Sequence, residues 1–144
     1  MTIKVAIACD HGGVELKNFL KTAVTSPEIE WLDLGTNTTD SVDYSDYGYK
    51  LAEAVAGGQA EYGIAICGSG IGISIAANRH KDIRAALCMN TTMAHLAREH
   101  NDANVLCLGA RLTGDILAQE VTETFLTTKF EGGRHAGRVD KLSQ

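Results

Sequence analysis

A cysteine stands where an apolar run meets a glycine-rich turn. Residues 62–66 read Tyr-Gly-Ile-Ala-Ile, residues 67–72 read Cys-Gly-Ser-Gly-Ile-Gly, and a further apolar stretch follows. Alternating glycines let backbone amides converge on one point, and the start of a following helix adds its positive end there. Thiolate is the reactive form of cysteine, and such surroundings favour it. The segment therefore predicts a base or nucleophile, Cys67, beside a cradle for an anion.

The same segment departs from three common phosphate-binding motifs. A dinucleotide fingerprint, G-x-G-x-x-G, needs its third glycine where Ile73 stands, and a phosphatase-like C-x5-R needs arginine at that position. A P-loop needs Gly-Lys-Ser or Gly-Lys-Thr, and neither follows. The alternative is a tight turn that only packs a helix against a sheet. We favour a functional loop, because such a turn rarely needs three glycines and a serine beside a cysteine.

Apolar runs that suit strands alternate with segments that suit helices along the whole chain. Strands are predicted at 3–8, 31–34, 62–67, 83–88 and 104–108, and helices at 12–24, 44–55, from about 72, 91–99 and 113–127. This alternation indicates parallel strands with helices on both faces of the sheet. We therefore expect one α/β domain over residues 1–144, a Rossmann-like three-layer α/β/α sandwich with a mostly parallel five-stranded sheet. Residues 129–144 would form its basic C-terminal segment.

Two of the predicted helices have apolar residues at helical spacing, which should face the sheet. In the helix at 44–55 these residues are Tyr47, Leu51, Ala54 and Val55. In the helix at 113–127 they are Ile116, Leu117, Val121 and Phe125.

Polar residues follow several of the predicted strands, and doubly wound folds bind ligands at the carboxyl ends of their strands. Asp10 and His11 follow the first strand, although Asp10 also suits a helix N-cap and His11 a surface position. Arg111 follows the fifth strand. His100 and Asn101 come just past the fourth predicted helix, where a C-cap with Asn in the left-handed conformation is equally consistent.

Charge is distributed unevenly over the chain. The net charge of −5 at pH 7 disfavours nonspecific binding of nucleic acid. Residues 129–141 hold four basic and two acidic side chains, or +2, so the remainder carries −7. Arg134 and Arg138 lie four residues apart and share a face if that segment is helical, as in a phosphate clamp; a solvated tail is the alternative. A basic segment on an acidic protein suits a small anionic ligand.

Composition bounds the class of protein further. A chain of 144 residues with 44% hydrophobic residues can form one domain with a sizeable core. No segment is long enough for a membrane span, and the N-terminus lacks a signal-peptide pattern, so we expect a cytoplasmic protein without membrane contact. Cys-x-x-Cys pairs are absent, and three of the four cysteines, Cys9, Cys88 and Cys107, should be small core residues. No His, Asp or Glu spacing indicates a metal site.

Five segments together resemble the ribose-5-phosphate isomerase type B and galactose-6-phosphate isomerase family: residues 9–13, 43–44, 66–78, 100–104 and 131–135. The likeness runs from about residue 3 to residue 139, and its motifs are long and ordered. The resemblance implies an aldose–ketose isomerase that acts on a phosphorylated sugar without cofactor or metal. It also implies the Rossmann-like fold that the alternation of elements predicts.

The resemblance assigns roles to individual residues. Cys67 matches the base that moves a proton between C1 and C2, and Ser69 matches a donor to the enediolate that forms. His100 matches the group that opens the sugar ring, with Asp10 on another sugar oxygen. Tyr44 matches a residue of the sugar pocket. The full set matched to substrate binding is His11, Tyr44, Gly68, Gly70, Ile71, Gly72, Asn101, Arg111, Arg134 and Arg138, of which His11 and the three arginines match the phosphate site.

The family forms homodimers or tetramers whose sites are shared between subunits. The residues expected to reach the partner are His100, Asn101, Arg111, Arg134 and Arg138. One subclass uses a glutamate as base where Ile73 stands here, so this chain resembles the cysteine type. We expect ribose 5-phosphate and ribulose 5-phosphate as substrates. A six-carbon sugar phosphate, such as allose 6-phosphate or galactose 6-phosphate, and a non-catalytic phosphosugar-binding module are the alternatives.

Overall fold

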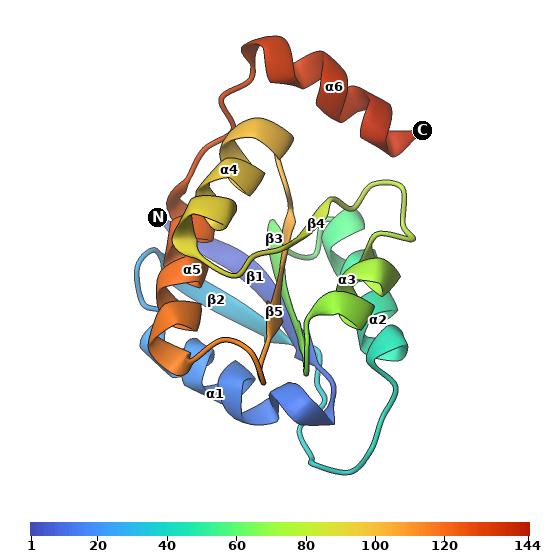
Figure 1. Cartoon of the computed structure of the whole chain (residues 1–144), viewed down its shortest axis with the longest axis vertical. Coiled ribbons are helices and arrows are strands. Elements are labelled where there is room, and N and C mark those ends of the chain that lie inside the picture. Colours follow the sequence, from blue (N-terminus) through green and yellow to red (C-terminus); the bar gives the residue numbers. More distant parts are fainter.

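The computed structural model describes residues 1–144, and its strands form a single sheet (Figure 1). The strands are β1 (Thr2–Cys9), β2 (Glu28–Asp33), β3 (Tyr62–Cys67), β4 (Ala85–Leu87) and β5 (Val105–Gly109). Their order is β2-β1-β3-β5-β4, and every pairing is parallel. The predicted Rossmann-like sheet is confirmed.

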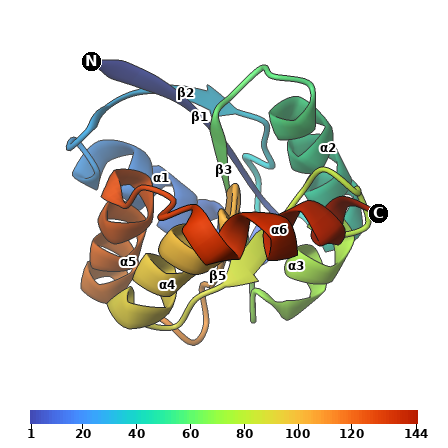
Figure 2. The same cartoon turned by 90° about the horizontal axis from the view of Figure 1, so that it is seen from above.

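Helices cover both faces of this sheet, as Figure 2 shows from above. They are α1 (Val14–Ala23), α2 (Tyr44–Ala56), α3 (Ile71–Ala77), α4 (Thr91–Asn101), α5 (Asp115–Thr127) and α6 (Ala136–Asp140). Short 3-10 turns lie at His11–Gly13, Gly133–His135 and Lys141–Ser143. Helices α1, α4 and α5 pack on one face and α2 and α3 on the other, which gives the three predicted layers. The C-terminal segment is helical and lies beyond the end of α4 (Figure 1).

The central strand β3 shows why the core has two halves. Ile64 and Ile66 belong to the apolar cluster on the side of α1, α4 and α5. Ala65 and Cys67 belong to the cluster on the side of α2 and α3. Successive side chains of a strand point to opposite faces, and both faces are covered here. The uninterrupted apolar run before Cys67 therefore marks a buried central strand.

The stripe predicted for α5 is wrong in part. Val121 and Phe125 are fully buried, but Ile116 and Leu117 are 65% and 40% exposed. The buried side chains of this helix are Ala118, Val121, Thr122, Phe125 and Leu126. These positions recur every three to four residues and share one face of the helix. Ile116 and Leu117 lie outside that face. In α2 the predicted residues Leu51, Ala54 and Val55 are buried, and Tyr47 packs against the cluster beside them.

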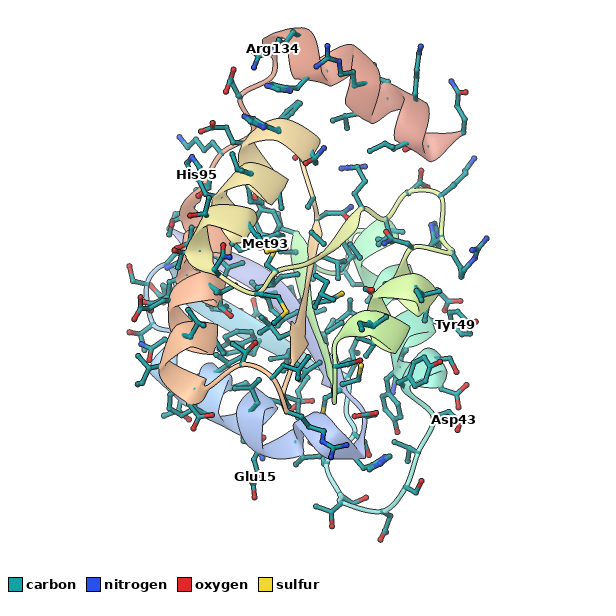
Figure 3. All side chains as sticks on the ribbon, viewed as in Figure 1. Glu15, Asp43, Tyr49, Met93, His95 and Arg134 are labelled. Atoms are coloured by element: carbon teal, nitrogen blue, oxygen red, sulfur yellow. The ribbon has the colours of Figure 1, made fainter.

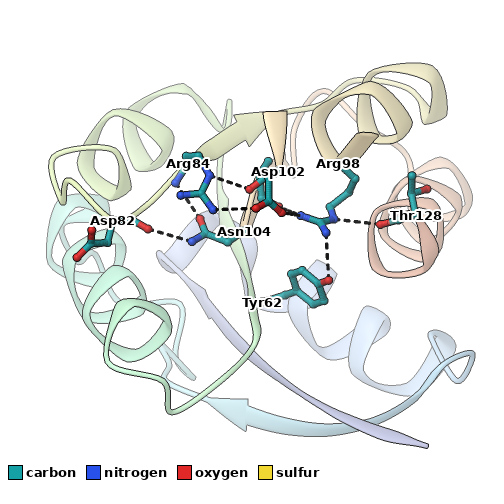
Figure 4. A network of polar contacts seen from close by, with 8 residues as sticks. Tyr62, Asp82, Arg84, Arg98, Asp102, Asn104 and Thr128 are labelled. Atoms are coloured by element: carbon teal, nitrogen blue, oxygen red, sulfur yellow. Dashed lines mark hydrogen bonds and ion pairs between the residues drawn. The ribbon is translucent and has the colours of Figure 1, made fainter. Parts of the chain in front are cut away.

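Element ends differ from the prediction mainly at α4 and at the edge strands. Helix α4 continues through Asn101, and Asp102 rather than Asn101 adopts the left-handed cap conformation, with φ 47°. Figure 4 shows the ion pair of 2.9 Å between Arg98 and Asp102, which stabilises this longer helix end. Strand β2 begins at Glu28, before the predicted start at residue 31. The prediction missed these first residues because an edge strand tolerates exposed acidic side chains, which hide its apolar pattern.

The helices are all too short, or too polar, to cross a lipid bilayer.

Candidate active site

A cleft of about 850 Å³ opens at the carboxyl ends of β1, β3 and β5. This is the edge at which doubly wound folds bind ligands. Its lining residues are Asp10, Tyr44, Cys67, Gly68, Ser69, Ile71, Gly72, Ile75, Arg111 and Leu112. The structure therefore brings eight of the predicted site residues together within one chain.

The thiol of Cys67 lies at the base of this cleft. Cys67 is the last residue of β3 and is only 4% exposed. The backbone N–H of Gly70 donates a hydrogen bond of 3.1 Å to its Sγ atom. The Ser69 hydroxyl accepts a hydrogen bond of 3.1 Å from the N–H of Ile71, and its own proton remains available to a ligand. These amides of Gly70 and Ile71 bond within the loop, so the Ser69 hydroxyl, rather than either amide, is available as a donor to a developing oxyanion.

Two glycines of the loop have steric reasons to be glycine. Gly70 has φ +78°, and a Cβ atom there would lie 2.6 Å from Leu87 Cδ1 and 2.9 Å from the carbonyl carbon of Leu108. Gly72 lies under the ring of Tyr44, where a Cβ atom would come within 2.5 Å of the ring. Gly70 thus lets the turn close over the sheet, and Gly72 lets Tyr44 approach the loop.

The other three cysteines do not suit chemistry. They are buried in the core, as predicted. Burial raises the pKa of Cys9 and of Cys88 to about 11, and it raises the pKa of Cys107 further. Their thiols are therefore protonated at neutral pH, and none of them lines the cleft.

Asp10 both caps a helical turn and lines the cleft, the two roles that its place in the sequence suits. Its Oδ1 atom accepts a hydrogen bond of 2.9 Å from the N–H of Gly12 and so caps the 3-10 turn. The same carboxylate lines the cleft. His11 lies next to it, exposed and outside the lining set, and its Nδ1 atom accepts a hydrogen bond of 3.1 Å from the N–H of Val42. That bond leaves Nε2 as the donor of the neutral ring.

Arg111 lies in the cleft of its own chain. It follows β5, and its N–H donates a hydrogen bond of 2.9 Å to the carbonyl of Gly68. Its side chain contacts the glycine loop, since a Cβ atom on Gly68 would lie 3.1 Å from Arg111 Cδ. The guanidinium thus provides a positive charge in the cleft that holds Cys67.

The remaining predicted residues lie at the opposite edge of the sheet. His100, Asn101 and Arg138 line a second cavity of about 310 Å³ with His135, Val139 and Leu142. His100 and Asn101 therefore do not enter the cleft of their own chain, because α4 runs antiparallel to its strands and ends at their amino edge. Figure 3 shows Arg134 at one end of the molecule and Asp43, next to Tyr44, at the other.

Sequence reasoning missed His135, which lies against His100. The two rings are stacked, with centroids 4.4 Å apart and an interplanar angle of 14°. His135 is only 6% exposed, and its Nε2 atom has no hydrogen-bond partner. The ligand atoms of His100, Glu131 and His135 lie within 4.8 Å of one another, so these residues could hold a metal ion. The spacing of four residues between Glu131 and His135 was the available signal.

The fold and the cleft define a small Rossmann-like enzyme domain that places a thiol, a carboxylate and a guanidinium around one substrate-sized space. Residues 5–142 match the family model described as Ribose/Galactose Isomerase. The chain belongs to this family.

Relatives of similar length support this assignment. The putative sugar phosphate isomerase YwlF of Bacillus subtilis is 49% identical, over 98% of this chain and 95% of the relative. Ribose-5-phosphate isomerase B of Escherichia coli is 43% identical, over 97% of this chain and 94% of the relative. The solved ribose-5-phosphate isomerase B of Clostridium thermocellum is 50% identical with a TM-score of 0.95, over 98% and 95% of the two chains. Ribose-5-phosphate isomerase B of Mycoplasma genitalium, solved with bound ribulose-5-phosphate, is 38% identical with a TM-score of 0.92. The match covers 97% of this chain and 93% of that chain.

Proposed function

We propose that this protein interconverts ribose 5-phosphate and ribulose 5-phosphate, with Cys67 as the base. The observation that carries the proposal is the Cys67 thiol in the cleft, hydrogen-bonded to the N–H of Gly70, in a chain of this isomerase family. The hydrogen bond from the N–H of Gly70 holds the sulfur in a fixed position, and thiolate is the form of cysteine that acts as a base. Such a group can take a proton from a sugar carbon and return it to the next one.

The chemistry balances without an added reactant. In the aldose-to-ketose direction the Cys67 thiolate takes the proton from C2, and the resulting enediolate carries the negative charge. The thiol then returns the proton to C1, and a proton moves from O2 to O1, so that the aldehyde becomes an alcohol and C2 becomes a ketone. The Ser69 hydroxyl stabilises the enediolate, and the arginine of the cleft, Arg111, contributes to phosphate binding.

We further propose that the complete site forms between two copies of the chain. His100 and Cys67 lie at opposite edges of the sheet, and the five residues of β5 between those edges span roughly 17 Å. They can serve one substrate only if a second copy brings its His100, Asn101, Arg134 and Arg138 to the cleft. In this arrangement Asp10 and His11 act beside Cys67 of their own chain. His100 of the second copy, together with Asp10, opens the sugar ring.

Exposed apolar side chains on α4, on α5 and just before these helices suit this arrangement. They are Met89, Met93, Leu96, Leu112, Ile116 and Leu117, each at least 39% exposed. They come from α4, α5 and the segments just before them, and Leu112 also lines the cleft. A homodimer that buries this surface would place the partner chain at the mouth of the cleft. A tetramer made of two such dimers is the other expected assembly.

The whole chain, residues 1–144, serves in this proposal as one isomerase domain, with residues 129–144 as its basic phosphate-binding segment. Phosphorylated sugars are intracellular metabolites, and so we place the protein in the cytoplasm.

The first experiment measures the conversion of ribose 5-phosphate to ribulose 5-phosphate by the purified protein, with allose 6-phosphate and galactose 6-phosphate in parallel. We expect turnover of the pentose and a loss of at least about 10²-fold in kcat for Cys67→Ala. Cys88→Ala is the matched control, since its thiol lies outside the cleft. Turnover of only a hexose phosphate would change the assigned substrate, and binding without turnover would identify a non-catalytic module.

A second experiment tests the shared site. Cys67→Ala and His100→Asn variants, each inactive alone, are unfolded together and refolded as a mixture. If the site contains residues of two chains, mixed dimers regain one intact site, and about a quarter of the wild-type activity returns. Light scattering measures the mass of the same samples and separates dimer from tetramer. No recovery of activity in a sample shown to contain mixed dimers would overturn the shared site.

A further inference from the structure

Three potential metal ligands meet at the end of α4, away from the cleft that holds Cys67. Their ligand atoms, on His100, Glu131 and His135, lie within 4.8 Å of one another. Two histidines and a glutamate form one of the sets of three protein ligands that hold zinc while leaving a fourth position open. The cavity of about 310 Å³ that adjoins both histidines provides room for that fourth ligand.

His135 gives the independent reason to expect a ligand here. Its side chain is 8% exposed, yet its Nε2 atom has no hydrogen-bond partner. The nearest acceptor, Glu131 Oε1, is 3.7 Å away, which is too long for a hydrogen bond. A buried polar atom without a partner is costly and rare in native proteins. The Glu131 carboxylate beside this atom is itself a member of the cluster, so an ion held there would supply the missing partner.

We propose that His100, Glu131 and His135 bind Zn²⁺, and that the bound ion inhibits the enzyme by occupying His100. Zinc bonds of about 2.0–2.2 Å place tetrahedral ligand atoms about 3.4 Å apart, so the cluster must contract slightly. His135 is the fixed ligand because it is buried. His100 and Glu131, with side chains 36% and 44% exposed, are free to turn toward the ion.

Local geometry and charge agree with a site that binds zinc reversibly. The lone pairs of imidazole lie in the ring plane, so the stacked ring of His100 must rotate away from that of His135 when both bind one ion. The Glu131 carboxylate also leaves its exposed contact of 3.8 Å with Arg134, which contributes little. Glu99, 3.5 Å from His100, adds negative charge that offsets Arg134 and Arg138.

The binding part of this proposal is independent of the proposed function, whereas the inhibitory part rests on it. Binding is therefore measured on the full chain with Cys67→Ala, which removes the thiol of the cleft as a competing ligand. Titration with Co²⁺ should produce the visible absorption of a four- or five-coordinate site at one ion per chain. Zn²⁺ should displace this ion, and Mg²⁺ should not, because imidazole ligands favour later transition metals. Absence of the Co²⁺ absorption would overturn the proposal.

Ligand variants in the same Cys67→Ala chain locate the ion. Glu131→Gln and His135→Asn should each weaken Co²⁺ binding by about tenfold or more. His95→Asn is the matched control, because His95 also lies beside a glutamate, 3.0 Å from Glu99, but outside the cluster. Glu131 is exposed, so its variant tests the site even if His135→Asn fails to fold. Binding that is unchanged in Glu131→Gln, or weakened as much in His95→Asn, would contradict the assigned ligands.

Inhibition is measured on the chain with Cys67 present. Zn²⁺ should inhibit isomerisation, EDTA should restore it, and Glu131→Gln should need about tenfold more Zn²⁺ for the same effect. Equal inhibition of the wild-type chain and Glu131→Gln would mean that zinc acts at Cys67 and would overturn the regulatory role. If the chain had no isomerase activity, the Co²⁺ titration would still decide the metal site, so the two proposals fail separately.

Discussion

The backbone N–H of Gly70 donates a hydrogen bond of 3.1 Å to the Sγ atom of Cys67, three residues earlier in the chain. This bond needs the left-handed conformation of Gly70, which turns the amide back toward the end of β3. The reactivity proposed for the thiol therefore depends on a backbone conformation that favours glycine. A substitution at Gly70 changes that conformation without touching the sulfur.

Gly70→Ala should reduce both stability and activity. A Cβ atom would collide with Leu87 and with the backbone after Leu108, and the φ of +78° disfavours any side chain. We expect a loss of about 1–3 kcal/mol in the free energy of unfolding, measured in urea, and a loss of kcat of at least about tenfold. Gly58→Ala is the control, since Gly58 also has a positive φ, +81°, but its Cβ meets open space and it lies outside the cleft, so this variant should keep its kcat. Wild-type kcat in a folded Gly70→Ala protein would show that the loop does not position the base.

Alkylation should identify Cys67 as the reactive cysteine. At pH 8 a thiol with a pKa of about 11, as for Cys9 and Cys88, is ionised in only about one molecule in a thousand. Cys107 is fully buried with a pKa raised further. Iodoacetamide followed by peptide mass spectrometry should label Cys67 first, in step with the loss of activity, and ribose 5-phosphate should slow both. Loss of activity that tracks labelling of another cysteine would contradict the assignment.

The sequence allowed the strand, turn and thiol around Cys67 to be predicted because the signals are local. An apolar run, alternating glycines and a helix start occupy consecutive residues, and parallel pairing then brings Asp10 and Arg111 to the same edge. The position of His100 could not be predicted in this way. It depends on where α4 ends in space, and the two extra residues of that helix are stabilised by contacts with distant segments, including the carbonyl of Thr128.

Long-range packing also explains the other differences. Ile116 and Leu117 have the hydrophobicity of core residues, yet the sheet contacts the neighbouring face of α5. The burial of His135 depends on the path of the C-terminal segment over the end of α4, which composition and spacing do not determine. The roles proposed for residues that act with a second copy of the chain also stay predictions, because they depend on packing between chains.

Asp102 should contribute more to stability than an ordinary surface carboxylate. It accepts a hydrogen bond of 2.9 Å from Arg98, whose side chain is 5% exposed, and it pairs with Arg84 at 3.5 Å (Figure 4). Asp102→Asn leaves the Arg98 guanidinium with only neutral partners. We expect a loss of about 1–3 kcal/mol in the free energy of unfolding in urea. Glu30→Gln, which removes the exposed pair with Lys4 at 3.9 Å, should cost less than about 0.5 kcal/mol. Equal losses of stability in Asp102→Asn and Glu30→Gln would contradict the role proposed for the contacts of Asp102 with Arg98 and Arg84.

Asp33 pairs with a fully buried lysine, and this should make folding sensitive to acid. Lys17, 0% exposed, donates hydrogen bonds to both carboxylate oxygens of Asp33, at 2.8 and 3.0 Å, and to Asn37 at 2.6 Å. Burial by itself raises the pKa of Asp33, but hydrogen bonds from Lys17, Lys21 and the N–H of Gly35 outweigh it and hold the pKa below its ordinary value.

A carboxyl group whose pKa is lower in the folded chain stabilises the fold above its unfolded pKa of about 3.9, and that contribution disappears as the pH falls through the folded value. The free energy of unfolding should therefore decline from about pH 5 to pH 3 in the wild-type chain. Asp33→Asn should be less stable at pH 7, because Lys17 loses its counter-charge, and its decline with acid should be shallower. Asp40→Asn, in the exposed loop before α2, is the control and should follow the wild-type curve. Urea titrations at each pH measure these values, and parallel curves for Asp33→Asn and the wild-type chain would show that other carboxylates cause the acid sensitivity.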